Sequence, residues 1–269
     1  MSPPFVEVEG GHRLFVRDWG TGRPALMLAS WAMDSRLWSA TMIALNEGGV
    51  RTVAYDRRGH GRSDDPGVVG YDLLADDLHA VIEALDLHDL TIVAHSASAG
   101  EAIRYVSRHG SDRLSRIVMV GATGPRMLAG PGNPLGLPQE ALGGLLTQLS
   151  FSLEEWIDAN ADPFAPGSST RTIAWLSSMV LDTSRRILVD FQREAAETDL
   201  SEEASRICVP VTLIHGDRDV SAPLDLTARS YARIIPGSDL IVYEGVAHGV
   251  MVASPERLAA DVLDAMRRS

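Results

Sequence analysis

Short apolar runs rich in branched side chains recur along the chain, separated by segments with helical periodicity. The runs have strand length and lie at 25–29, 50–55, 90–94, 116–120, 211–214 and 240–243. Several are apolar throughout instead of alternating, which is typical of central strands buried on both faces of a parallel sheet. The segment 12–19 alternates more clearly, and we expect it to form an antiparallel edge strand.

Amphipathic helical patterns fall between these runs. One helix face is formed by Leu74, Leu78, Val81, Ile82 and Leu85. Asp72 lies just before this face and is its expected N-cap. Near the end of the chain, Ser254 and Pro255 read as an N-cap followed by a proline at the first helical position. Strands that alternate with helices in this way predict an α/β fold with a mostly parallel, doubly wound sheet.

The segment 125–200 breaks this alternation because it contains no convincing strand. It opens with a Gly/Pro-rich connection and continues with helical patterns, including a capping box at Ser152 and Glu155. One apolar face in it is formed by Ile173, Leu176, Met179 and Val180. We expect a helical cap or lid at 125–200, inserted after the sixth strand into a core formed by 1–124 and 201–269.

Composition narrows the class of protein. The chain has 269 residues and a net charge of 24 − 36 = −12, so an acidic surface makes nucleic acid an unexpected partner. No apolar stretch approaches the roughly 18 residues of a membrane span, and the first residues lack the pattern of a secretion signal. Cys208 is the single cysteine, which fits a reducing compartment, and we expect a cytoplasmic protein. The sequence leaves association into a homo-oligomer open.

A candidate nucleophile follows the strand at 90–94. The chain there reads His-Ser-Ala-Ser-Ala-Gly from 95 to 100, which approximates the Gly-x-Ser-x-Gly turn that raises a serine above a sheet. The motif permits two registers, with Ser96 or Ser98 as the nucleophile. We prefer Ser96 because it follows the apolar run directly. Ala94 and Ser98 then occupy the flanking positions that glycines usually fill.

A serine nucleophile needs a histidine to accept its proton and a carboxylate to orient that histidine. On this fold the acid follows a late strand, and both Asp217 and Asp219 follow the run at 211–214. His248 follows the last strand and is the candidate base. His215 and the nearby aspartates suggest a metal site as an alternative, but no second cluster of ligands accompanies them, so we expect no metal.

Taken together, these segments resemble the α/β-hydrolase superfamily, most of all its cofactor-free haloperoxidases, perhydrolases and aryl esterases. The resemblance is carried by 53–64 (VAYDRRGHGRSD), 100–110 (GEAIRYVSRHG), 197–200 (ETDL) and 245–249 (GVAHG). It covers nearly the whole chain and is weakest in the cap. It implies Ser96, Asp219 and His248 as a catalytic triad. It also implies that the backbone N–H groups of Trp31 and Ala97 form the oxyanion hole, with no cofactor.

Three features depart from the pattern of that group. Ala29 and Ser30 stand where the group usually has His-Gly, which affects the loop expected to carry the oxyanion hole. Ala32 follows Trp31 where perhydrolases commonly have proline, so we expect weak peracid chemistry. Ser98 replaces the glycine of the turn, and its hydroxyl has either a structural role or an effect on the site.

The expected activity is hydrolysis of a carboxylic ester through an acyl-enzyme. Alternatives are cleavage of a lactone or an amide by the same residues, a weak perhydrolase or haloperoxidase activity, cofactor-free oxygenation, and a ligand receptor that keeps the triad. In each case the partner is a small molecule. Candidate walls of an apolar pocket are Trp31, Met33, Trp156, Phe164 and Trp175.

Overall fold

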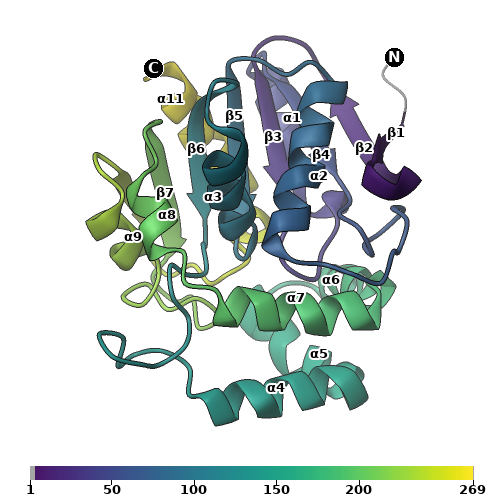
Figure 1. Ribbon diagram of the computed structural model, residues 1–269, viewed down its shortest axis with the longest axis vertical. Helices are drawn as coiled ribbons and strands as arrows, with labels where there is room; N and C mark the ends of the chain where they lie inside the picture. The colour runs from purple at the N-terminus through teal and green to yellow at the C-terminus, as the bar shows by residue number, and fades with distance from the viewer. Residues whose placement is uncertain (1–3, 269) are drawn as a thin grey trace.

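An eight-stranded sheet in the order β1-β2-β4-β3-β5-β6-β7-β8 forms the centre of the computed structural model, which describes residues 4–268 (Figure 1). The strands are β1 (Phe5–Val8), β2 (His12–Trp19), β3 (Pro24–Leu28), β4 (Arg51–Tyr55), β5 (Leu90–His95), β6 (Leu114–Val120), β7 (Val211–Gly216) and β8 (Asp239–Tyr243). From β4 to β8 neighbouring strands run parallel, whereas β2 pairs antiparallel with β1 and β4. The predicted mostly parallel sheet is confirmed.

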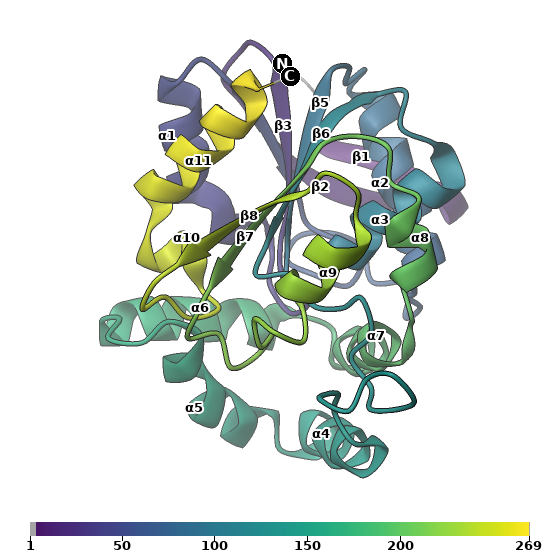
Figure 2. The same ribbon diagram turned by 90° about the vertical axis from the view of Figure 1, so that its left-hand side faces the viewer.

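Helices cover both faces of this sheet, as the doubly wound prediction requires (Figure 2). The α-helices are α1 (Ser39–Glu47), α2 (Tyr71–Ala84), α3 (Ser98–His109), α4 (Gln139–Phe151), α5 (Leu153–Phe164), α6 (Thr170–Asp182), α7 (Arg185–Glu197), α8 (Ser201–Ser205), α9 (Ala228–Ile234), α10 (Val250–Ala253) and α11 (Pro255–Arg267). Short 3-10 helices occur at Glu9–Gly11 and Ser35–Trp38. In Figure 2, α1 and α11 lie on one face of the sheet, and α2, α3, α8 and α9 lie on the other.

The central strands are apolar because both of their faces are covered. Every residue of β3, β5 and β7 is buried. The exposure pattern of β8 is different, since most of its residues are at least partly exposed at the end of the sheet. The segment His12–Trp19 is antiparallel as predicted but does not lie at the edge, because β1 pairs with its outer side.

The predicted helix caps are wrong in detail. Helix α2 begins at Tyr71 after Gly70, so Asp72 lies inside its first turn, where its carboxylate pairs with Arg104 and Arg108 instead of capping the helix. Ser152 precedes α5 at the N-cap position, but its side chain makes no capping hydrogen bond. Ser254 stands at the N-cap position of α11 as predicted and Pro255 lies in the first helical turn, but the Ser254 side chain likewise makes no capping hydrogen bond.

Between β6 and β7 the chain leaves the sheet and forms α4, α5, α6 and α7. These helices lie below the sheet in Figure 1 and face the ends where β3, β5, β6 and β7 finish. Among residues 4–268, no helix combines the length and apolarity that crossing a membrane requires. Because the carboxyl ends of parallel strands meet at one edge, the loops that follow β3, β5, β7 and β8 converge between the sheet and these capping helices.

Candidate active site

Ser96 lies in the sharp turn between β5 and α3. Its backbone has φ of 61°, a left-handed conformation that costs free energy in a residue with a side chain. The turn is held by the backbone N–H of Ser96, which donates to the carbonyl of Val120 at 3.0 Å, and by Ala99 N–H, which donates to the carbonyl of Ser96 at 3.1 Å. This strained strand–turn–helix presents the Ser96 hydroxyl at the end of the sheet.

The hydroxyl of Ser96 meets the side chains of His248 and Asp219. His248 Nε2 lies 2.9 Å from Ser96 Oγ, and His248 Nδ1 lies 2.7 Å from Asp219 Oδ2. All three residues are buried, with 5% or less of each exposed. An imidazole between a hydroxyl and a carboxylate can accept the hydroxyl proton, and the carboxylate stabilises the imidazolium that results.

The competing serine and aspartate point elsewhere. The hydroxyl of Ser98 is buried behind the turn, where it contacts the carbonyl of Ala29 and the guanidinium of Arg57. Asp217 is exposed, and its Oδ1 accepts a hydrogen bond of 2.7 Å from the backbone N–H of Gly245. Neither side chain makes a hydrogen bond to His248 within the described part of the chain.

Two further histidines surround this group. His95 Nε2 lies 3.1 Å from the carbonyl of His248, and His215 Nε2 lies 2.6 Å from the carbonyl of Ala222 and 3.3 Å from Asp219 Oδ2. Burial lowers the pKa of both His95 and His215, and for His95 repulsion from His248 lowers it further. Both rings are therefore neutral near pH 7, and neither adds a positive charge beside the imidazole of His248.

The acid loop does not form a metal centre in the described structure. Asp219 Oδ1 accepts a hydrogen bond of 2.7 Å from the backbone N–H of Ala222, so both of its oxygens already have partners. Among residues 4–268, no group of three or more histidine, cysteine or acidic side chains is arranged to hold a metal ion.

Trp31 follows β3 and lies against the cap. Its indole N–H donates to the carbonyl of Leu188 in α7 at 2.8 Å, and its carbonyl lies 2.7 Å from His60 Nε2. Burial, followed by the charge of Arg57, lowers the pKa of His60 to about 4. Trp31 and Ala97 both line the cavity beside Ser96, and within residues 4–268 no hydrogen bond engages the backbone N–H of either.

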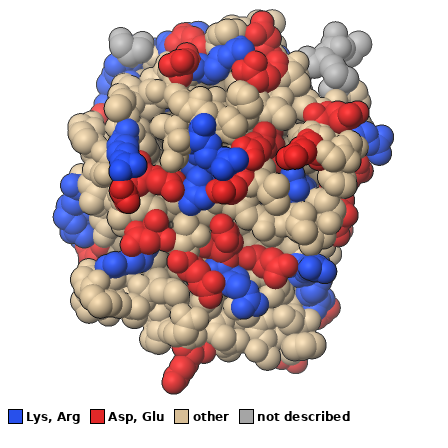
Figure 3. All heavy atoms as spheres, viewed as in Figure 1, with Lys and Arg blue, Asp and Glu red and all other residues tan. Residues whose placement is uncertain are grey.

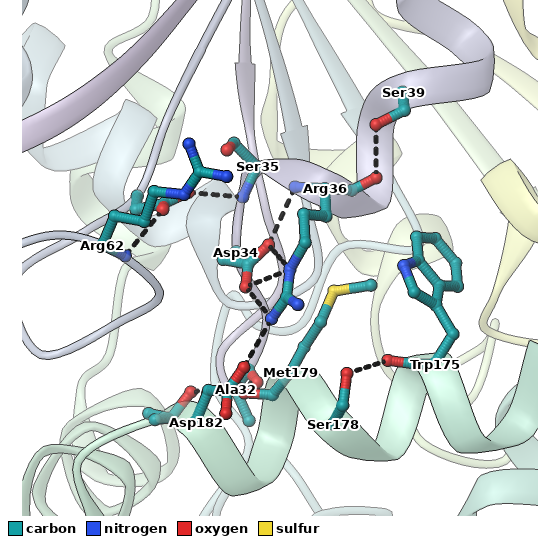
Figure 4. Close-up of polar contacts among 12 residues, drawn as sticks. Ala32, Asp34, Ser35, Arg36, Ser39, Arg62, Trp175, Ser178, Met179 and Asp182 are labelled. Carbon is teal, nitrogen blue, oxygen red and sulfur yellow. Dashed lines mark hydrogen bonds and ion pairs between the residues drawn. The ribbon is translucent and has the colours of Figure 1, made fainter. Parts of the chain in front are cut away.

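A cavity of about 270 Å³ opens between Ser96 and the cap. Its walls include four of the five predicted aromatic and sulfur-containing residues, namely Trp31, Met33, Trp156 and Phe164. Trp175 is not among them: it lies on α6 with 36% of its surface exposed (Figure 4). Of the described residues that line the cavity, none is acidic, and His248 is the only basic one. On the face drawn in Figure 3, acidic and basic side chains are instead interspersed over the outer surface.

The sequence did not identify the polar lining supplied by the cap. Asn160 of α5 and Gln192 of α7 both line the cavity. Asn160 Nδ2 donates to the carbonyl of Trp156 at 2.8 Å, whereas the Gln192 amide makes no hydrogen bond to any described residue. Helical periodicity predicts that these residues lie on helices but not which side faces a cavity between elements.

The cap is attached to the core beside the Trp31 loop. Arg36 Nη2 lies 2.6 Å from Asp34 Oδ2 and 2.8 Å from Asp182 Oδ2, so one guanidinium joins the loop after β3 to the end of α6 (Figure 4). Thr183 Oγ1 donates to the carbonyl of Ala32 at 3.3 Å. These contacts and the Trp31–Leu188 hydrogen bond connect the cap to the loop that borders Ser96.

Comparison with known proteins agrees with this architecture. Residues 20–261 match the Alpha/beta hydrolase family. The chain is 34% identical to the non-heme chloroperoxidase CPO-A1 of Kitasatospora aureofaciens, over 98% of this chain and 100% of that one. It is 31% identical to the bifunctional esterase/perhydrolase DCH of Acinetobacter calcoaceticus, over 98% and 99%. An esterase from Exiguobacterium antarcticum superposes with a TM-score of 0.94 at 25% identity, with 98% of each chain covered.

These matches extend over nearly the full length of the chain, including the cap, and they include proteins named as esterases. With the strained serine turn, the parallel sheet and the helices inserted after β6, they identify the chain as a member of the Alpha/beta hydrolase family.

Proposed function

We propose that this protein hydrolyses an uncharged carboxylic ester through a covalent acyl-Ser96 intermediate. The observation that carries the proposal is the continuous line of contacts from Ser96 Oγ to His248 at 2.9 Å and from His248 to Asp219 at 2.7 Å. A surface cluster of the same residues would be screened by water, whereas here all three are buried at the base of a cavity.

In the first half of the reaction, Ser96 Oγ attacks the ester carbonyl carbon and His248 Nε2 takes the hydroxyl proton. The negative charge that develops on the carbonyl oxygen is stabilised by the backbone N–H groups of Trp31 and Ala97. The bond to the leaving alcohol then breaks, and His248 returns the proton to the alkoxide. Asp219 keeps His248 Nδ1 protonated, so that Nε2 is free to accept.

In the second half, a water molecule attacks the acyl carbon. His248 accepts a proton from that water, a second oxyanion forms against the same two N–H groups, and the bond to Ser96 Oγ breaks. The proton on His248 passes to Ser96, and the carboxylic acid leaves. Each oxyanion donor contributes roughly 3–4 kcal/mol to transition-state stabilisation in enzymes of this kind.

The cavity narrows the class of substrate. A cavity of about 150 Å³ accommodates benzene, so a space of about 270 Å³ fits a molecule with roughly ten non-hydrogen atoms. Because its described walls carry no acidic group and no Lys or Arg, a charged substrate would lose hydration there without gaining a counter-charge. A compact, neutral ester or lactone therefore suits the site.

Labelling with a fluorophosphonate tests the nucleophile. The reagent should modify Ser96, and mass spectrometry of the peptides should find no adduct on Ser98. Ser96→Ala should lower kcat for a p-nitrophenyl ester by a factor on the order of 10⁴–10⁶. Ser98→Ala is the control for the site of modification, because it removes the neighbouring hydroxyl and the adduct should still form on Ser96. An adduct on Ser98 would reverse the assignment.

A perhydrolase side activity is the second candidate, favoured by the similarity to a protein named as a bifunctional esterase/perhydrolase. Hydrogen peroxide would replace water as the nucleophile toward acyl-Ser96 and release a peracid. Ala32 stands after Trp31 where perhydrolases commonly have proline, so we expect this activity to be slower than hydrolysis. Peracid formation from an ester and peroxide, measured beside hydrolysis of the same ester, compares the two directly.

A further inference from the structure

A buried arginine lies behind the serine turn and has no place in the reaction described above. Arg57 is 2% exposed, and its Nε donates to Glu101 Oε2 at 2.8 Å. Its Nη1 donates to the carbonyl of Ser30 at 3.0 Å. Its Nη2 contacts both the carbonyl of Ala29 and the hydroxyl of Ser98. One guanidinium therefore binds two separate segments of the chain.

These two segments are the ones expected to supply the oxyanion donors. Ala29 and Ser30 directly precede Trp31 in the loop after β3, while Ser98 and Glu101 lie in the first turn of α3, directly after Ala97. The same cation holds both, so it contributes to the separation between the loop and the helix in addition to the pairing of β3 with β5. The separation of the N–H groups of Trp31 and Ala97 depends on the same contacts.

Arg57 also determines the direction of one donor. The carbonyl of Ser30 and the N–H of Trp31 belong to one planar trans peptide group, so they point in opposite directions. The Ser30 carbonyl is held by Arg57 Nη1 at 3.0 Å and by the N–H of Met33 at 3.2 Å. With this oxygen fixed toward the buried guanidinium, the N–H of Trp31 is directed away from Arg57. Trp31 itself lines the cavity beside Ser96.

The Ala97 donor is fixed in a comparable way by the backbone. The carbonyl of Ser96 shares a peptide group with the N–H of Ala97, and it accepts hydrogen bonds from Ala99 N–H at 3.1 Å and Thr123 N–H at 3.3 Å. The helix turn therefore orients Ala97 without a side chain. The Trp31 peptide belongs to an irregular loop without such a helix, and it is held by one backbone hydrogen bond, from Met33 N–H, and by the side chain of Arg57.

From this geometry we propose that Arg57 is a positioning residue for the oxyanion hole, and that Ser98 links it to the loop after β3. The positive charge of Arg57, which lies against the Ser30 carbonyl, also polarises that peptide group and strengthens Trp31 N–H as a donor. The inference rests on the ester hydrolysis proposed above. It assigns to both residues an effect on the transition state, with no contact to the substrate.

Ser98 connects two of the departures from the family pattern, those at positions 29 and 98. Its hydroxyl accepts a hydrogen bond from Arg57 and donates one to the carbonyl of Ala29. The serine that replaces the turn glycine thus reaches the alanine that replaces the usual histidine. A glycine at 98 would leave the Ala29 carbonyl with Arg57 alone, so the added hydroxyl closes the connection between α3 and the loop.

Arg57→Lys tests the proposal, with Arg58→Lys as the matched control. Arg58 is also buried and pairs with Asp77 at 2.6 Å, but among the described residues its side chain makes no hydrogen bond or ion pair to the loop after β3. Lysine keeps the charge beside Glu101 and loses the forked geometry that reaches two carbonyls. We expect Arg57→Lys to lower kcat and kcat/KM equally, by roughly 10–100-fold, with KM unchanged, as for loss of a transition-state interaction.

Ser98→Ala is the second variant, since it removes the link while keeping the buried Arg57–Glu101 pair. A decrease in kcat of about tenfold is expected for a misaligned oxyanion donor. If Arg57→Lys and Arg58→Lys lose activity equally, or if KM alone changes, the positioning role is wrong. Crystal structures of the wild type and Arg57→Lys give a readout that needs no turnover. A reoriented Ser30–Trp31 peptide supports the role, and an unchanged peptide contradicts it. Absence of wild-type ester hydrolysis would overturn the proposed function alone.

Discussion

Replacing Asp219 with asparagine tests the electrostatic part of the mechanism while keeping the shape of the site. The asparagine side chain would retain an oxygen to accept the N–H of Ala222, which lies 2.7 Å from Asp219 Oδ1. At the other position an amide would face His248 Nδ1, now 2.7 Å from a carboxylate oxygen. Without the negative charge, Nδ1 no longer holds its proton in preference to Nε2, and the tautomer that accepts from Ser96 is lost.

The expected magnitude follows from that distance. Two unit charges 2.7 Å apart attract each other by about 6 kcal/mol at an effective dielectric constant of about 20. Since about 1.4 kcal/mol corresponds to a factor of ten in rate, losing the carboxylate charge should lower kcat by roughly 10⁴-fold. The loss of activity should appear in kcat and not in KM, because the imidazolium exists only after Ser96 has begun to attack.

Hydrolysis of one p-nitrophenyl ester by Asp219→Asn and Asp217→Asn provides the comparison. Asp217 is two residues away and exposed, and an asparagine there still accepts the N–H of Gly245. Asp217→Asn should therefore retain activity within about threefold of wild type, as expected for a surface substitution. Circular dichroism and urea unfolding check that both variants are folded. A large loss in Asp217→Asn together with a small one in Asp219→Asn would refute the assignment of the acid.

Two further predictions concern stability. Gly100→Ala would place a Cβ 2.3 Å from Cζ of buried Tyr71 and should lower the free energy of unfolding by roughly 1–3 kcal/mol. Its control, Gly143→Ala in α4, meets no atom within 4 Å and should raise the free energy of unfolding by up to about 1 kcal/mol. Equal urea midpoints for the two variants would contradict the packing. Burial lowers the pKa of His60, His95 and His215 in the folded protein. Below the ordinary histidine pKa near ~6.5, the unfolded chain therefore binds more protons at these positions than the folded protein does. Stability should fall as pH decreases from there toward about 4, the folded pKa of His60. The slope is at most roughly 4 kcal/mol per pH unit for the three groups together, and unchanged urea midpoints between pH 7 and 5 would contradict it.

The sheet could be predicted from the sequence because strands buried on both faces consist mostly of consecutive apolar residues. The runs at 90–94 and 211–214 coincide with β5 and β7 to within a residue or two. Strand β1 was missed, since it has only four residues, too few for their alternation to stand out. Without β1, the segment His12–Trp19 read as an edge strand. Helix starts were less certain, because at Ser152 the residue type suggested a capping bond that the side chain does not make.

The candidate site likewise contains residues that the sequence could indicate and residues that it could not. A serine after a buried strand and a histidine after the last strand carry sequence signals, and the structure brings Ser96, Asp219 and His248 together, although their roles stay predictions. Arg57 and His60 lie in the segment 53–64 that carries the resemblance, but that motif does not reveal what they bind. Their partners are backbone carbonyls of a loop some thirty residues earlier, and a carbonyl has no residue type that a sequence could reveal.

The cost of burying Arg57 is itself an argument about its role. Removing two charges from water costs several kcal/mol for each ion, and a buried pair often contributes less to stability than well-packed apolar residues of similar volume. The Arg57–Glu101 pair is nearly fully buried at 2.8 Å, so stability alone gives a weak reason for it. An apolar side chain in its place could fill the volume, but it could not hold the carbonyls of Ala29 and Ser30 or orient the peptide of Trp31. Among the contacts that Arg57 makes, these are the ones for which a guanidinium has no apolar substitute, and they lie at the loop where the proposed reaction needs a fixed N–H donor.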